Sequence, residues 1–145
     1  RVKDFVPFNK GTRITMIAAI GVEEIKTAMY GAWHTNREIF IYFIERCLVP
    51  ILKPGHIVLL DNLPVHKTPK VRELIERAGA RLVYLPAYSP DLTPIELCWS
   101  KIKGYIKKQK ARTVNALNKV VKAAFATVNS SDLENWYEHC GYSIQ

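Results

Sequence analysis

Two short apolar runs on either side of one helix pattern constrain the fold of this chain more than any other feature. The runs are HIVLL at 56–60 and RLVYL at 81–85, and each is typical of a short strand buried on both faces. Between them, TPKVRELIERAG at 68–79 has a Thr cap, Pro in the first turn and a terminal Gly, which predicts a helix. A strand, a helix and a second strand within about 30 residues predict a right-handed crossover between parallel strands.

The segments on both sides of this unit complete an α/β pattern. The segment 12–21 is rich in β-branched residues and predicts a strand, with 24–33 as its antiparallel partner. Thr35 or Asn36 begins a helix that Pro50 ends. Three further helices are predicted over about 94–110, 113–128 and 131–141, the last opened by a capping box of Ser131 and Glu134. The fold class is α/β, with helices flanking a mixed sheet.

The composition is that of one folded domain covering residues 1–145, apart from its charge. No apolar run reaches the roughly 18 residues that a membrane-spanning helix needs, and the start has no signal-peptide pattern, so we expect a cytoplasmic protein without a membrane partner. The cysteines Cys47, Cys98 and Cys140 lack metal-type spacing and are expected to be reduced. Lys and Arg number 21 against 13 Asp and Glu, a net charge of +8 that favours a nucleic acid partner over an indifferent basic surface.

Two carboxylates are predicted to meet at one edge of the sheet. Asp61 directly follows the strand at 56–60, and Glu96 lies at the start of the helix that follows the strand at 81–85. Parallel strands end at the same edge, where open α/β sheets usually bind ligands. Paired carboxylates suit Mg²⁺ or Mn²⁺, which can activate water and neutralise the charge of a phosphodiester. The spacing therefore indicates a metal-dependent site for phosphate chemistry.

The helix that begins near Glu96 is strongly basic. Its remaining residues, 97–112, contain no acid. Such a helix can contact the phosphates of DNA without reading the base sequence. The candidate DNA-binding residues are Lys101, Lys103, Lys107, Lys108, Lys110 and Arg112.

Each of these residues also has a purely structural interpretation. In TPIE at 93–96, Glu96 completes a capping box with Thr93. Asp61 can begin an Asx turn, and His66 can cap or pack. Trp99, one turn after Glu96, is more often a core residue than a DNA contact. Spacing alone leaves these alternatives open.

The motifs VLLDNLPVHKT at 58–68 and YLPAYSPDLTPIELCWSKIK at 84–103 resemble the catalytic core of insertion-sequence transposases of the mariner superfamily. Members are DDE enzymes with a ribonuclease H-like fold. The resemblance includes the turn from Asp61 and Asn62 to His66, the proline loop before Glu96, and the 34 residues that separate Asp61 from Glu96. It extends to WYEHCGY at 136–142 and so covers most of the chain.

The resemblance implies cut-and-paste DNA transposition with Mg²⁺ or Mn²⁺. Water would hydrolyse a phosphodiester at the transposon end, and the freed 3′-hydroxyl would attack target DNA, commonly at TA. Asp61 and Glu96 would be the catalytic metal ligands, and Asn62, His66 and Lys103 would support the site or the DNA. The implied partners are the terminal inverted repeats, target DNA and further copies of the chain, in a nucleoid-associated protein.

The chain departs from the family pattern at several points. Ala87 stands where the loop usually has a second proline, and Thr93 where Asn is usual. The family's first Asp lies on a first strand upstream of this sequence, and Asp4 should not be given its role. We therefore expect an N-terminally incomplete catalytic domain without its helix-turn-helix, which aggregates or exchanges a strand with another copy. The alternatives are a non-catalytic remnant that binds DNA or transposase subunits, and an unrelated metal-dependent phosphatase or nuclease.

Overall fold

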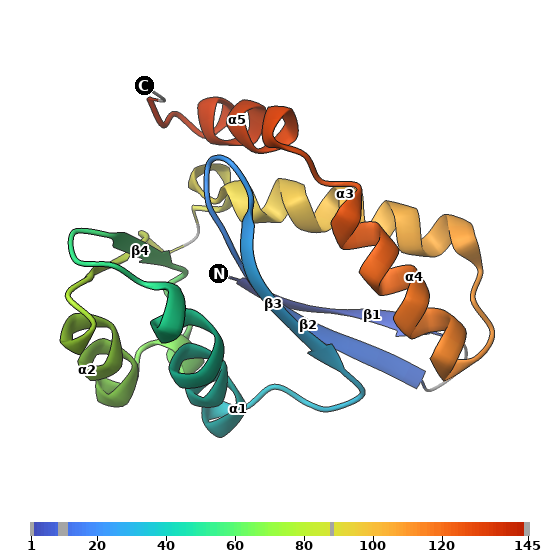
Figure 1. Ribbon diagram of the computed structural model, residues 1–145, viewed down its shortest axis with the longest axis horizontal. Helices are drawn as coiled ribbons and strands as arrows, with labels where there is room; N and C mark the ends of the chain where they lie inside the picture. The colour runs from blue at the N-terminus through green and yellow to red at the C-terminus, as the bar shows by residue number, and fades with distance from the viewer. Residues whose placement is uncertain (1, 9–11, 88, 144–145) are drawn as a thin grey trace.

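The first three strands form one antiparallel sheet (Figure 1). The computed structural model describes the backbone of residues 2–8, 12–87 and 89–143 and the side chains of 14–87, 89 and 91–143. The strand order is β1-β2-β3, with β1 at Val2–Phe8, β2 at Thr12–Ile20 and β3 at Ile25–Gly31. The predicted antiparallel pairing of segment 12–21 with segment 24–33 is confirmed. The strand β1 was not predicted; it contains Pro7 and lies at an edge of this sheet, where Pro is tolerated.

The predicted parallel crossover is confirmed. Strand β4 (Ile57–Leu60) pairs in parallel with β5 (Arg81–Tyr84), and α2 (Pro69–Arg77) connects them. The Thr68 hydroxyl accepts a hydrogen bond from the Val71 amide, so Thr68 is the N-cap that the sequence predicts. At the other end, Gly79 has a φ of +85°, a left-handed conformation that favours glycine and stops the helix.

The mixed sheet is divided into two smaller sheets. Among the described residues, β4 pairs only with β5, and β1-β2-β3 forms a separate sheet. A groove of about 540 Å³ lies between them, lined by the end of β2, by all of β4 and by apolar side chains of the helix after β3. The α/β class is confirmed, and the single continuous sheet that the sequence suggested is replaced by two. Because an edge strand beside an apolar groove can pair with a further strand, self-association stays a prediction.

The helix that follows β3 changes its geometry along its length. It begins as α1 (Arg37–Phe43), where the Asn36 side chain accepts a hydrogen bond from the Ile39 amide. It continues as a π-helical turn over Ile44–Leu48 and a 3₁₀ turn over Val49–Ile51. The 3₁₀ turn contains Pro50, which lacks the amide hydrogen that a continued helix would need. Of the two predicted caps, Asn36 is the one used.

Three helices complete the chain: α3 (Pro94–Gln109), α4 (Val114–Ala126) and α5 (Ser130–His139). The capping box of α5 consists of Asn129 and Asp132, so the prediction of Ser131 and Glu134 was wrong by two residues. Asp132 also pairs with Lys101 of α3, which favours this earlier start. No helix among the described residues is both long enough and apolar enough to cross a membrane.

Strand β2 separates two hydrophobic cores. Successive side chains of a strand point to opposite faces of its sheet. Accordingly Ile14, Met16 and Ala18 pack with residues of α3 and α4, including the fully buried Trp99. Ile17 and Ala19 contact the other core, which α1, α2, β4 and β5 form. The two cores therefore hold α3, which carries Glu96, and β4, which precedes Asp61, on opposite sides of β2.

The three cysteines are free thiols, as expected. Burial raises the pKa of the Cys98 thiol to about 12, and it also raises the pKa values of Cys47 and Cys140. A thiol that stays protonated at neutral pH is a poor nucleophile and a poor metal ligand. The cysteines are therefore packing residues.

Candidate active site

Asp61 follows the carboxyl end of β4. The parallel ladder continues for one more bond, from the Leu85 amide to the Leu60 carbonyl at 2.8 Å, so the chain is still held in place where Asp61 begins. The turn after it contains a 3₁₀ segment, Pro64–His66, which directs the chain away toward α2. The Asp61 side chain is half-buried at the mouth of this turn.

Glu96 lies in the first turn of α3, and its side chain is exposed. The proline loop before it contains a 3₁₀ segment, Pro90–Leu92. The Thr93 hydroxyl donates to the Ser89 carbonyl at 3.1 Å and accepts no hydrogen bond from the α3 amides. The structural interpretation of TPIE as a reciprocal capping box is therefore wrong in its Thr93 half. The loop uses this hydroxyl to hold its own turn.

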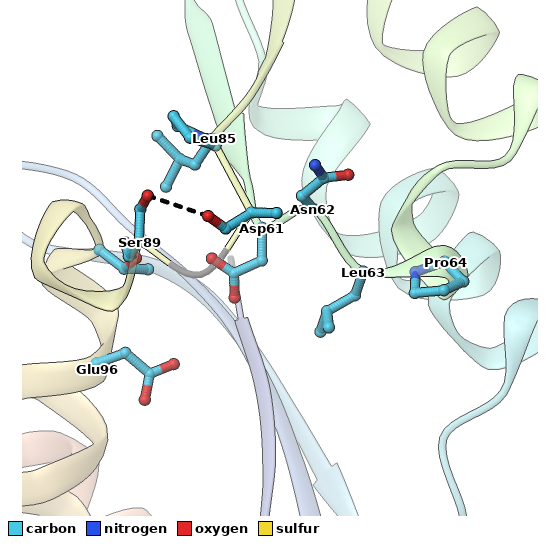
Figure 2. Close-up of a pocket in the computed structure, with 10 residues that line it drawn as sticks. Asp61, Asn62, Leu63, Pro64, Leu85, Ser89 and Glu96 are labelled. Atoms are coloured by element: carbon cyan, nitrogen blue, oxygen red, sulfur yellow. Dashed lines mark hydrogen bonds between the residues drawn. The ribbon is translucent and has the colours of Figure 1, made fainter.

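The two carboxylates line one pocket of about 380 Å³ (Figure 2). The side chain of Asp61 points from the end of β4 toward the space that Glu96 enters from α3, and Asn62 lies beside Asp61. The structure thus brings these three predicted residues together. The complete lining is Asp61, Asn62, Leu63, Pro64, Leu85, Pro86, Ala87, Ser89, Thr93 and Glu96.

The side-chain atoms of this pocket that could bind a metal ion are oxygen atoms, and the only side-chain nitrogen among the lining residues is the amide nitrogen of Asn62. Neither a cysteine nor a histidine is among the residues that line it. Oxygen donors suit Mg²⁺ and Mn²⁺, whereas structural zinc sites use sulfur and imidazole. Within the described part of the chain, Asp61 and Glu96 belong to no group of three acidic, His or Cys side chains that could hold a metal ion. The residues present fit a hard divalent cation as a two-carboxylate set.

His66 lies behind the pocket and does not line it. Its side chain is 0% exposed and stacks on Phe40, with 4.3 Å between ring centroids. Its Nδ1 lies 3.3 Å from the Asp61 carbonyl oxygen, and its own carbonyl accepts a hydrogen bond from the Tyr84 hydroxyl at 2.7 Å. His66 therefore packs in the core, as one alternative proposed, and also contacts the backbone that carries Asp61.

Tyr84 couples this turn to α2. Burial raises the pKa of the Tyr84 phenol, an effect that the nearby Arg72 guanidinium opposes. The guanidinium carbon lies 5.6 Å from the centre of the ring. The phenol therefore remains protonated at neutral pH and can donate to the His66 carbonyl. This contact holds the turn after Asp61 through a residue that does not line the pocket.

The basic residues of α3 have two different environments. The Lys101 ammonium donates to the Thr127 carbonyl at 2.9 Å and pairs closely with Asp132, and this contact lowers the pKa of the Asp132 carboxyl. Lys103 is half-exposed. The exposed members are Lys107, Lys108, Lys110 and Arg112. The structure holds Lys101 in an internal ion pair, while the assignment of the whole set to DNA stays a prediction.

Two further cations belong to the same basic region and were missed in the sequence analysis. Lys119 and Lys122 are exposed on α4, which packs against α3. The signal was available, because residues 97–131 contain eight Lys and Arg residues and no acid. The rest of the chain contains 13 basic and 13 acidic residues, so this stretch carries the whole net charge of +8.

Comparison with known proteins identifies the family. A family model described as a DDE superfamily endonuclease matches residues 2–118. Two curated relatives come from Caenorhabditis briggsae. The Tcb2 transposase is 33% identical over 55 residues, which are 38% of this chain and 20% of the relative. The Tcb1 transposase is 31% identical over 68 residues, 47% of this chain and 25% of the relative. The matches span a quarter or less of these relatives.

Solved structures show the same fold. The catalytic domain of Mos1 transposase with raltegravir and Mg has a TM-score of 0.78 at 17% identity, covering 99% of this chain and 83% of that one. A Mos1 paired-end complex with the left transposon end has a TM-score of 0.74 at 19% identity, covering 92% and 42%. The ribonuclease H-like fold predicted from the sequence is thereby confirmed.

Proposed function

We propose that this chain, which belongs to the DDE superfamily endonuclease family, is the catalytic-core part of a transposase that cuts and joins DNA with a divalent metal ion. One observation carries the proposal: Asp61 and Glu96 come from separate elements and line one pocket with oxygen donors. Mos1 structures with Mg and with Mn support the choice of metal.

In this proposal Asp61 and Glu96 hold Mg²⁺ or Mn²⁺. The bound ion would activate water and neutralise charge on the phosphodiester. Asn62 supplies an amide beside Asp61, and His66 keeps the turn in place through the Asp61 carbonyl. Without a cation, the two carboxylates would repel a DNA phosphate, so metal binding reverses the sign of the local field. The site is therefore expected to bind DNA better when metal is present.

The basic residues would hold the DNA backbone beyond the pocket. Helix α3 rises about 1.5 Å per residue, so Lys107 lies about 16 Å along its axis from Glu96. DNA that reaches both must therefore follow the helix for several nucleotides. Mos1 complexes with transposon ends and a Mos1 transpososome support terminal-repeat DNA and further copies of the chain as partners. Attack of the freed 3′-hydroxyl on target DNA, commonly at TA, remains part of this proposal.

A non-catalytic role is the second candidate. The two carboxylates form no larger ligand group within the described residues, and the basic α3–α4 region does not depend on them. Such a chain could bind DNA or transposase subunits without cutting. It would lack the metal dependence that the first proposal requires.

One experiment distinguishes the two candidates. Fluorescence anisotropy measures DNA affinity with and without Mn²⁺, for the unchanged chain and for Asp61→Asn and Glu96→Gln. We expect Mn²⁺ to strengthen DNA binding by the unchanged chain, while both variants lose this response. Nicking of supercoiled plasmid is followed in the same samples. DNA affinity that is indifferent to Mn²⁺ and to both substitutions would refute the metal site and favour the non-catalytic role.

The salt dependence of DNA binding tests the basic region. Replacing Lys107 and Lys108 together by Gln removes two exposed cations, so the slope of log affinity against log salt should fall by about 2. The double change Lys119→Gln with Lys122→Gln should do the same if α4 also contacts DNA. Lys101→Gln is the matched control on α3, because its ammonium is already paired with Asp132. An unchanged slope in both double variants would contradict the assignment.

A further inference from the structure

The chain just after α5 contacts the loop that precedes Glu96. The Tyr142 hydroxyl donates a hydrogen bond of 2.7 Å to the carbonyl of Leu92, one residue before the N-cap of α3. We infer that Tyr142 is a positioning residue for the Glu96 carboxylate, acting through this loop. The inference rests on the proposed function, because it assigns Glu96 to a metal site.

The start of α3 lacks the side-chain cap that usually fixes a helix terminus. A side chain at the N-cap normally accepts a hydrogen bond from the first free amides of a helix and fixes its start. At α3 the Thr93 hydroxyl instead donates to the Ser89 carbonyl, and the Leu92 amide donates to the same carbonyl at 3.1 Å. The loop is thus held by its own short bonds. Tyr142 adds a bond from a different element.

Local geometry at the end of α5 directs Tyr142 toward the loop. Gly141 has a φ of +93°, a left-handed conformation that reverses the chain after the helix. The Tyr142 amide donates to the Tyr137 carbonyl at 2.9 Å, and the Gly141 amide donates to the Glu138 carbonyl at 2.9 Å. These two bonds form a Schellman motif. Tyr142 therefore leaves the helix in one defined direction.

Helix α5 is also attached at two other points, so it can act as a brace. Near its start, Asp132 pairs with Lys101 of α3. Farther along, the Tyr137 hydroxyl donates to the Ile20 carbonyl at the end of β2, at 3.1 Å. The Tyr137 ring meets the Tyr142 ring edge to face, with 5.8 Å between centroids. Figure 1 shows α5 lying along the start of α3. Tyr142 is thus fixed relative to both α3 and β2.

Tyr142→Phe removes the hydroxyl and keeps the ring, so it tests the bond to Leu92. Hydrogen–deuterium exchange followed by mass spectrometry measures the opening of residues 89–97. Because the loss of one hydrogen bond is involved, we expect about fivefold faster exchange there, with unchanged exchange in α2 and α4. Tyr105→Phe is the control, since it makes the same chemical change on α3 itself. Faster exchange throughout the chain, or unchanged exchange at residues 89–97, would overturn the inference.

Metal affinity separates positioning from a merely structural contact. We expect Tyr142→Phe to weaken Mn²⁺ binding, measured by titration calorimetry, by about tenfold, within the range seen when an outer support of a metal ligand is lost. Gly141→Ala should weaken it too, because alanine disfavours the left-handed turn although space is open around its Cβ. Faster loop exchange with unchanged Mn²⁺ affinity would refute positioning. If the unchanged chain shows no Glu96-dependent Mn²⁺ binding, the proposed function fails instead, and exchange alone decides whether Tyr142 holds the loop.

Discussion

Replacing Asp61 by Asn, or Glu96 by Gln, is expected to weaken Mn²⁺ binding to the pocket by at least about 100-fold. Loss of an outer support of a metal ligand already costs 10- to 100-fold, so loss of a charged ligand should cost no less. Both side chains enter the pocket from different elements, and neither can take the place of the other. Each single change should therefore give nearly the full loss, and the double variant should lose little more.

Titration calorimetry or electron paramagnetic resonance of Mn²⁺ measures this loss. Glu38→Gln is the matched control, because Glu38 is an exposed acid on α1 that does not line the pocket. The same variants should bind DNA at least as tightly as the unchanged chain when no metal is present, since each removes a negative charge near the phosphates. Equal Mn²⁺ affinity in Glu38→Gln and Glu96→Gln would contradict a shared site at Asp61 and Glu96.

The meeting of Asp61 and Glu96 could be predicted from sequence because it depends on topology. Two apolar runs joined by one helix define parallel strands, and parallel strands end at one edge. The outcome does not depend on side-chain detail. The helix caps were less predictable, because short motifs compete: Thr93 bonds to Ser89 instead of capping, and Asn129 displaces Ser131 as the cap of α5.

Tertiary partners explain the remaining differences. In sequence, Lys101 is indistinguishable from Lys108, yet the structure pairs it with Asp132, 31 residues away. No local pattern encodes such a contact. From sequence, His66 could cap, pack or support the site, and the structure buries it and stacks it on Phe40. The separation of the two sheets was not predictable, since strand periodicity identifies strands but not which edges pair.

Helix α3 carries three different kinds of residue along its length. Its first turn presents Glu96 to the pocket, its buried face carries Ile95, Trp99 and Ile102, and its last turns carry exposed lysines. A displacement of the helix would move the carboxylate and the cations together. We therefore expect tight packing of its buried face to support both the proposed metal site and the proposed DNA contacts. The most informative position for testing this expectation is Trp99.

Trp99→Ala is expected to lower the free energy of unfolding by about 3–5 kcal/mol, as for other large buried aromatic residues. Trp99 is 1% exposed and meets Phe125 edge to face at 6.0 Å between centroids, so truncation leaves a cavity between α3 and α4. Urea denaturation followed by circular dichroism measures the change.

Trp99→Phe separates packing from other roles of this residue. The Trp99 indole N–H is buried and donates to no hydrogen-bond acceptor among the described residues, so its removal relieves an unsatisfied donor. Phe also keeps an aromatic ring in the core, so Trp99→Phe should lower the free energy of unfolding by less than Trp99→Ala does. If Trp99 instead stacked on DNA, Trp99→Ala would reduce DNA affinity while leaving stability nearly unchanged. Because a core position predicts the reverse order of effects, the two measurements together decide between the interpretations.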